Sequence, residues 1–193
     1  YFVVGTVGLW AKVSLAVIDQ LSEGPQIIVG SSMGGWISLL AAVARPGRVK
    51  ALVGLAAAPD FTVRMWHQEF DDATRAEVLA NGYMQRPCDY GDDPYTITKA
   101  LIDDGWNNRL LAAPIQLDIP VRLIQGTLDP DVPWQTAQQN AHKIKGEDVE
   151  VSLVPGGNHR MSRDIDIYSL FRVVGDLATA LTPWGEISKP GPA

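Results

Sequence analysis

One short stretch, residues 26–36 (QIIVGSSMGGW), constrains the fold more than any other part of the chain. It begins with an apolar run, Ile27 to Val29, that is typical of a buried strand, and after a Gly/Ser turn the apolar positions recur at helical spacing. Residues 30–34 match Gly-x-Ser-x-Gly, a pattern whose central serine lies on a strained turn between a strand and a helix. Ser32 is therefore the candidate nucleophile.

Two other interpretations of this stretch are weaker. A frame centred on Ser31 would need small residues where Val29 and Met33 stand, so Ser31 is interpreted as a neighbour of the nucleophile. The pattern also occurs by chance in loops rich in glycine and serine, but the change from strand to helix favours the sharp turn. In that turn Gly30 and Gly34 would let the strand and the helix pass close together.

The rest of the chain predicts an α/β fold, in which strands and helices alternate around a mostly parallel sheet flanked by helices. Expected helices cover 9–21, 33–44, 134–145 and a final segment with Ile167, Leu170, Phe171 and Val174 on one face. Expected strands cover 26–30, 50–57, 121–126 and 149–154, with a further short strand at 1–5. We expect residues 1–193 to form a single domain, with a tail at about 183–193 rich in Pro and Gly.

Residues 60–105 differ in composition from the rest of the chain. They hold ten acidic and four basic residues, a difference that equals the whole net charge of −6. Their expected helices are separated by turn signals. The interpretation is a small, mobile helical cap insertion whose aromatic side chains reach an acyl pocket, with Phe61, Trp66, Tyr83 and Tyr95 as candidates; the alternative is a solvated acidic face without a role.

Composition excludes several classes of partner. Hydrophobic residues make up 46% and no basic cluster is present, so nucleic acid is not an expected partner. Cys88 is the single cysteine, which leaves no disulfide framework or thiolate metal cluster. Neither a signal peptide nor a membrane span is evident in the first eighteen residues, so no membrane partner is expected and a cytoplasmic location is predicted.

A serine nucleophile needs a base and an acid. Ser32, Asp129 and His159 each follow the end of an expected strand, and ligands of parallel sheets bind at such ends. An imidazole can take the serine proton, and a carboxylate on its other nitrogen fixes the tautomer and stabilises the imidazolium. Asp131 competes for the acid position, but Asp129 is nearer the strand end. The other histidines, His67 and His142, are interpreted as surface residues.

The chain resembles the α/β-hydrolases grouped as palmitoyl-protein thioesterases and mycophenolic acid acyl-glucuronide esterases. The resemblance extends from about residue 10 to 181 and is carried by GSSMGGW at 30–36, AAPDF at 57–61, DVPW at 131–134 and HRMS at 159–162. It implies the α/β-hydrolase fold and hydrolysis of oxygen or sulfur esters of carboxylic acids. It also implies that Ser32, Asp129 and His159 form the triad and that no metal or organic cofactor is needed.

The front of the chain departs from this family. The N-terminal strands and the His-Gly loop that donates to the oxyanion hole are not found before residue 26, and residue 1 is Tyr rather than Met. The backbone N–H of Met33 is expected to supply one oxyanion donor. A sheet shortened on this side would expose an apolar edge, so a homo-oligomer or another partner covering residues 1–25 is predicted.

The sequence therefore predicts a serine carboxylic-ester hydrolase that forms an acyl-enzyme and whose substrate is a small-molecule acyl ester or thioester. Two alternatives stay open: an acyltransferase or perhydrolase on the same triad, and a catalytically impaired binding module of the same fold.

Overall fold

Four parallel strands form the central sheet of the computed structural model, which describes residues 4–87 and 93–181. The strands are β1 (Gln26–Ser31), β2 (Val49–Leu55), β5 (Val121–Gly126) and β6 (Val149–Val154), in the spatial order β1-β2-β5-β6. This order confirms the predicted parallel sheet with helical crossovers. The carboxyl ends of all four strands therefore lie along one edge of the sheet.

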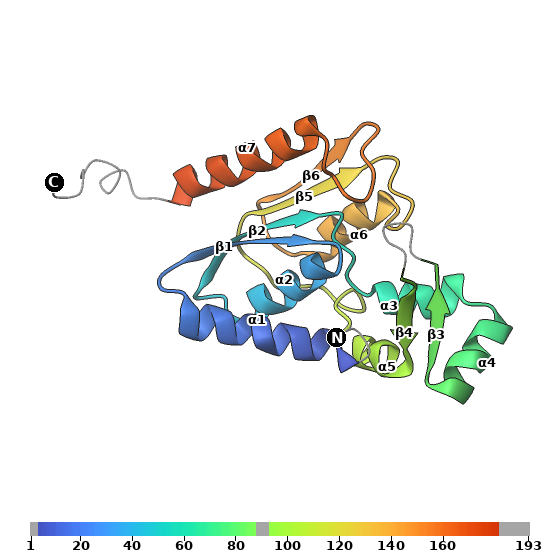
Figure 1. Cartoon of the computed structure of the whole chain (residues 1–193). Helices are drawn as coiled ribbons and strands as arrows, with labels where there is room; N and C mark the ends of the chain where they lie inside the picture. The colour runs from blue at the N-terminus through green and yellow to red at the C-terminus, as the bar shows by residue number, and fades with distance from the viewer. Residues whose placement is uncertain (1–3, 88–92, 182–193) are drawn as a thin grey trace.

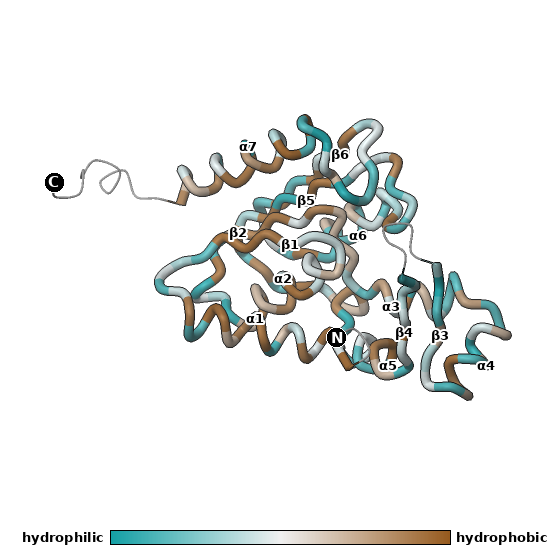
Figure 2. The backbone as a smooth tube through the Cα atoms, in the orientation of Figure 1, coloured by the Kyte–Doolittle hydropathy of each residue, from teal (hydrophilic) through white to brown (hydrophobic). Residues whose placement is uncertain are grey.

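Helices cover both faces of the sheet (Figure 1). One face packs against α1 (Val7–Leu21), α2 (Met33–Ala44) and α6 (Gln135–Lys143), and the other packs against α7 (Asp164–Leu181). Successive residues of β2 alternate between these layers, since Leu52 belongs to the core cluster on the first face and Val53 to the cluster under α7. Figure 2 shows β2 as largely hydrophobic, as expected for a strand buried on both faces.

The face that the final helix, α7, buries overlaps only in part with the predicted one. Leu170 and Val174 pack against the sheet as predicted, together with Val173 and Leu177. Phe171 was predicted to lie on the same face, but its side chain is 72% exposed, and Ile167 is also exposed. The helix carries more apolar residues than one face can hold, so their spacing fitted two stripes and did not decide between them.

Residues 60–105, the acidic segment, lie beyond the carboxyl ends of β1 and β2 (Figure 1). The segment contains α3 (Phe61–Arg64), a single π-helical turn η2 (Met65–Glu69), α4 (Asp72–Asn81), β3 (Tyr83–Arg86), β4 (Tyr95–Thr98) and the start of α5 (Lys99–Asn107). The predicted helices are present, but the antiparallel pair β3 and β4 was not expected. A small cluster of its own, formed by Met65, Phe70, Val78, Ile97 and Ile102, holds the segment together. Its role as a cap stays a prediction.

Three predictions concern the ends and the gap of the described chain. Residues 4 and 5 are not in a strand, and the remainder of the strand predicted at 1–5 lies outside the described residues. The tail at 183–193 and Cys88 lie outside them as well. The assignment of 1–193 to one domain stays a prediction.

Candidate active site

Ser32 lies in a strained turn between β1 and α2. Its φ of 52° and ψ of −120° are unusual for a residue with a side chain, and such strain occurs most often at functional sites. Two backbone hydrogen bonds fix this residue to the end of β2: the Ser32 N–H donates to the Leu55 carbonyl (2.8 Å), and the Ala58 N–H donates to the Ser32 carbonyl (3.1 Å). The strand-to-helix turn that the sequence predicted is therefore present.

The glycines around Ser32 do not all serve the same purpose. A Cβ on Gly30 would lie 2.4 Å from the Gly34 carbonyl oxygen, so Gly30 is needed for the close passage of strand and helix. A Cβ on Gly35 would lie 2.5 Å from the Cβ of Ala57. A Cβ on Gly34 would meet no described atom within 4 Å, so our expectation that Gly34 itself allows the close approach is wrong. The packing requirement falls on Gly30 and Gly35.

The structure brings the three predicted residues together. The Nε2 atom of His159 is 3.1 Å from Ser32 Oγ, and its Nδ1 is 2.9 Å from Asp129 Oδ2. The Asp129 side chain is fully buried and that of His159 is 16% exposed. A hydroxyl, an imidazole and a buried carboxylate thus form one continuous chain of hydrogen bonds, which is the arrangement that activates a serine nucleophile.

Hydrogen bonds hold the loop that carries Asp129 against the loop that carries His159. The Leu128 N–H, next to Asp129, donates to the Gly157 carbonyl (2.9 Å), and the Gly156 N–H donates to the Thr127 hydroxyl (3.0 Å). Both loops leave neighbouring strands, β5 and β6, at the same edge of the sheet. Residues that are thirty positions apart in the chain are positioned by the register of two strands.

Asp129 and Asp131 have different surroundings. Asp129 Oδ1 accepts the backbone N–H groups of Asp131 and Val132, both at 2.9 Å, and Oδ2 accepts from His159 and from the side chain of Gln125. The Asp131 carboxylate lies 3.8 Å from the Arg86 guanidinium. The geometry favours Asp129 over Asp131 as the partner of the imidazole.

The pKa values of the acid and the base are shifted in opposite directions. Burial disfavours the charged form of Asp129, but hydrogen bonds from His159, Val132 and Asp131 outweigh burial and lower the pKa of this carboxyl. The hydrogen bond to Asp129 raises the pKa of His159 above its usual range, against the opposing effect of burial. Asp129 therefore stays ionised, while His159 can take up a proton near neutral pH.

The same residues are the strongest candidates for metal ligands among the described residues. Ligand atoms of Asp129, Asp131 and His159 lie within 4.8 Å of one another. Both Asp129 oxygens already accept two hydrogen bonds each, and His159 Nδ1 is one of the donors. We therefore assign no metal to this cluster. The expectation that no cofactor is needed stays a prediction.

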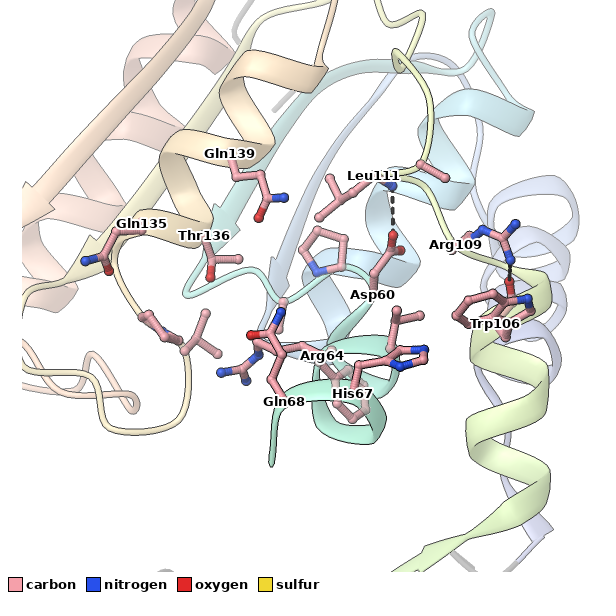
Figure 3. A pocket seen from close by; sticks show the side chains of 17 residues that line it. Asp60, Arg64, His67, Gln68, Trp106, Arg109, Leu111, Gln135, Thr136 and Gln139 are labelled. Carbon is pink, nitrogen blue, oxygen red and sulfur yellow. Dashed lines mark hydrogen bonds between the residues drawn. The ribbon is translucent and has the colours of Figure 1, made fainter. Parts of the chain in front are cut away.

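A cavity of about 570 Å³ lies beside the Ser32–His159–Asp129 group, between α3, the end of α5 and the start of α6 (Figure 3). Ser32 is not among its lining residues, but Ala58 and Val132, which bond to Ser32 and Asp129, are. Figure 3 shows Trp106, Arg109 and His67 on one side and Gln135, Thr136 and Gln139 on the other. The Arg109 guanidinium lies over the Trp106 ring, 4.4 Å from its centre.

Two of the four aromatic residues predicted to reach an acyl pocket line a cavity. Phe61 lines the larger cavity and Trp66 a second one of about 300 Å³, whereas Tyr83 and Tyr95 line neither. His67 and His142 are exposed, as predicted for surface residues. His67 nevertheless faces the larger cavity, where its ring lies 5.6 Å from that of Trp106.

Two buried polar residues near the site were missed in the sequence. Asp60 has a positive φ of 57° and accepts the N–H groups of Leu110 and Leu111, both at 2.8 Å, so it joins the start of the acidic segment to the loop that follows α5. Burial raises the pKa of this carboxyl, while these N–H groups and Arg109 oppose the rise. The second is Gln125, which bonds to Asp129 from within β5. A polar residue inside an apolar strand, four positions before the acid, was the available signal.

Comparison with known proteins gives consistent matches. The family model described as the alpha/beta hydrolase family matches residues 5–166. The mouse protein named palmitoyl-protein thioesterase ABHD10, mitochondrial, is 41% identical over 178 residues, which cover 92% of this chain and 60% of that protein. The chain thus spans about three fifths of the length of the curated relatives it matches.

Solved structures agree with the sequence matches. The structure of mouse alpha/beta hydrolase domain-containing protein 10 shares 40% identity at a TM-score of 0.86, over 93% of this chain and 72% of that one. The crystal structure of a protein described as a hydrolase from Agrobacterium vitis S4 shares 37% identity at a TM-score of 0.86, over 90% of this chain and 69% of that one. These comparisons confirm the predicted fold.

One prediction is corrected by the comparisons. A cytoplasmic location was predicted, but the related proteins are named as mitochondrial, which contradicts it. The prediction had only excluded a secretory signal and a membrane span, and these two observations do not distinguish cytoplasm from mitochondrion. Within the described residues, no helix is both long and apolar enough to span a bilayer.

Proposed function

Because the chain belongs to the alpha/beta hydrolase family, we propose that it is a serine hydrolase that cleaves carboxylic esters or thioesters through an acyl-enzyme. One observation carries the proposal: Ser32 Oγ, both ring nitrogens of His159 and Asp129 Oδ2 form a continuous hydrogen-bonded chain, with contacts of 3.1 and 2.9 Å. The proposed roles are nucleophile for Ser32, general base and then acid for His159, and orienting carboxylate for Asp129.

The first half of the reaction transfers the acyl group to the protein. Nε2 of His159 takes the hydroxyl proton while Ser32 Oγ attacks the carbonyl carbon of the substrate, and the charge on Asp129 stabilises the imidazolium that forms. The tetrahedral intermediate then expels the alcohol or thiol. His159 gives the proton to the leaving alkoxide or thiolate, which departs as the alcohol or thiol, so the imidazole is neutral again for the second half of the reaction.

The negative oxygen of that intermediate needs hydrogen-bond donors. Met33 is the first residue of α2, so its N–H has no partner within the helix and lies at the positive end of the helix dipole. We propose this N–H as one oxyanion donor. In the second half of the reaction His159 activates a water molecule, which attacks the ester carbonyl and releases Ser32.

The names of the relatives suggest the substrate class. They are named palmitoyl-protein thioesterases, and we propose that this chain also accepts S-acyl thioesters, with residues 60–105 acting as a cap that contributes to the binding surface. Phe61, on the first turn of that segment, lines the cavity beside the triad. A longer acyl chain would gain from such apolar contacts.

A panel of p-nitrophenyl esters and S-acyl thioesters of increasing chain length tests the proposal. Ser32→Ala should abolish nearly all turnover, and Ser31→Ala, which removes the neighbouring exposed hydroxyl, is the matched control that should keep it. Product analysis with added alcohol or peroxide reveals whether an acceptor other than water is preferred. Retention of more than a few per cent of turnover by Ser32→Ala would refute the assignment. A wild type that is inert to every ester and to fluorophosphonate would support the catalytically impaired binding module.

A further inference from the structure

A fully buried amide lies directly behind the proposed triad. Gln125 is on β5 between Ile124 and Gly126, and its side chain has no solvent exposure. Its Nε2 atom is 2.9 Å from Asp129 Oδ2 and 3.1 Å from the Val132 carbonyl oxygen. A buried amide is costly unless it is hydrogen-bonded. Here the contacts direct the amide donors into the loop that carries the acid, whereas the amide oxygen has no hydrogen-bond partner among the described residues.

The contact falls on the oxygen that also serves the base. Asp129 Oδ2 accepts from both Gln125 Nε2 and His159 Nδ1, whereas Oδ1 accepts only the backbone N–H groups of Asp131 and Val132. Within the described residues, the side-chain hydrogen bonds to Asp129 thus come from Gln125 and His159. The carboxylate is held in one rotation by donors on both of its oxygens.

We propose that Gln125 is a positioning residue of the triad, which orients Asp129 and shares the negative charge of Oδ2 with His159. This inference rests on the proposed function. The amide fixes the carboxylate so that Oδ2 faces the imidazole. It also stabilises charge on Oδ2, so less of that charge is available to stabilise the imidazolium.

Removal of the amide donor therefore has two separable effects. The carboxylate becomes free to rotate, which should lower kcat about tenfold, the size expected when a charged group loses one hydrogen bond. The carboxylate also becomes more basic and stabilises the imidazolium more strongly, so the pKa of His159 should rise further. A residue that only holds the loop in place would lower kcat without that second effect.

Other charges near the base stay constant in such a comparison. Asp131 acts on His159 electrostatically, and it faces Arg86 of β3, while the Asp131 carbonyl accepts from Arg64 of α3. Arg160 follows His159 in the chain. The Gln125 side chain instead donates to Asp129 and to the backbone carbonyls of Gly126 and Val132.

The test compares Gln125→Met, which keeps the length and volume of the side chain, with Gln138→Met on the exposed face of α6 as the matched control. Two quantities are measured: the pH dependence of kcat and KM on a p-nitrophenyl ester, and the pKa of His159 by NMR titration of the resting protein. Gln125→Asn, whose amide is one methylene too short to reach Asp129, takes the place of Gln125→Met if that variant does not fold.

Gln125→Met should lower kcat about tenfold with KM unchanged, and should move both the acidic limb of the profile and the His159 titration to higher pH. Gln138→Met should match the wild type. If Gln125→Met lowers kcat but leaves the acidic limb of the pH profile and the His159 titration unchanged, Gln125 has a purely structural role and the inference is overturned. Wild-type behaviour of Gln125→Met would also overturn it. An inactive wild type would refute the proposed function, but the NMR titration would still show whether Gln125 controls the charge at His159.

Discussion

Gly34 and Gly35 are neighbours in α2, but replacing each with alanine should change the stability of the protein differently. A Cβ on Gly35 would lie 2.5 Å from Ala57 Cβ and 2.8 Å from Ala57 Cα, about 1 Å closer than an ordinary carbon contact. Ala57 is buried, and the adjacent Ala58 bonds to Ser32, so the overlap cannot be relieved by turning a flexible side chain. A Cβ on Gly34 meets nothing within 4 Å.

Both substitutions gain up to about 1 kcal/mol from the better helix propensity of alanine, so this term cancels between them. Gly35→Ala in addition pays an overpacking cost of about 1–3 kcal/mol. Its free energy of unfolding should therefore be lower than that of Gly34→Ala by this amount. A shift of about 1 Å at Ser32 should also reduce kcat on the order of a hundredfold.

Chemical denaturation of both variants measures the difference in unfolding free energy, and turnover of a p-nitrophenyl ester by Gly35→Ala measures the displacement of Ser32. Equal stability of the two variants would refute the reasoning, because it would mean that Gly35 is not in close contact with Ala57. So would wild-type turnover by Gly35→Ala.

Three further predictions follow from the same geometry. Asp129→Asn should lower kcat about 10⁴-fold, as the equivalent change does in a serine protease, whereas Asp131→Asn should be mild; steady-state kinetics showing the reverse would move the acid to Asp131. Because the neutral imidazole is the base and Asp129 raises the pKa of His159, kcat/KM should fall towards acid pH with a midpoint above about 6.5; a measured midpoint below that value would contradict the shift. The chain should associate in solution, because β1 is an edge strand among the described residues and α1 exposes Leu9, Val13, Val17 and Leu21; a monodisperse monomer in light scattering at micromolar concentration would contradict this.

The sheet was predictable because each strand is short, apolar and bounded by turn residues. The expected strands at 121–126 and 149–154 match β5 and β6 residue for residue. β5 is largely buried and rich in Val, Leu and Ile, whereas in β6 Val149 and Val151 alternate with the exposed polar residues Glu150 and Ser152. The pair β3 and β4 was missed because its strands are only four residues long and mix exposed residues, such as Tyr83 and Gln85, with partly or fully buried ones. Such strands form through a pairing partner that the local sequence does not identify.

The members of the candidate site were predictable for a different reason. Ser32, Asp129 and His159 follow strand ends, and the topology of a parallel sheet places such positions at one edge. Asp60 bonds to N–H groups fifty and fifty-one positions away, and no local pattern announces such partners. Gln125 lies only four positions before Asp129, but a polar residue in a strand does not by itself show which group it contacts. The packing role of Gly35 in place of Gly34 depends in the same way on where Ala57 lies.

Covalent labelling identifies the nucleophile directly. The protein is incubated with a fluorophosphonate, digested, and the modified residue is located by tandem mass spectrometry within the stretch that contains both Ser31 and Ser32. We expect a single adduct on Ser32, which forms more slowly in Asp129→Asn and is lost in Ser32→Ala but not in Ser31→Ala. An adduct on Ser31, or an intact protein that remains unlabelled while correctly folded, would contradict this expectation.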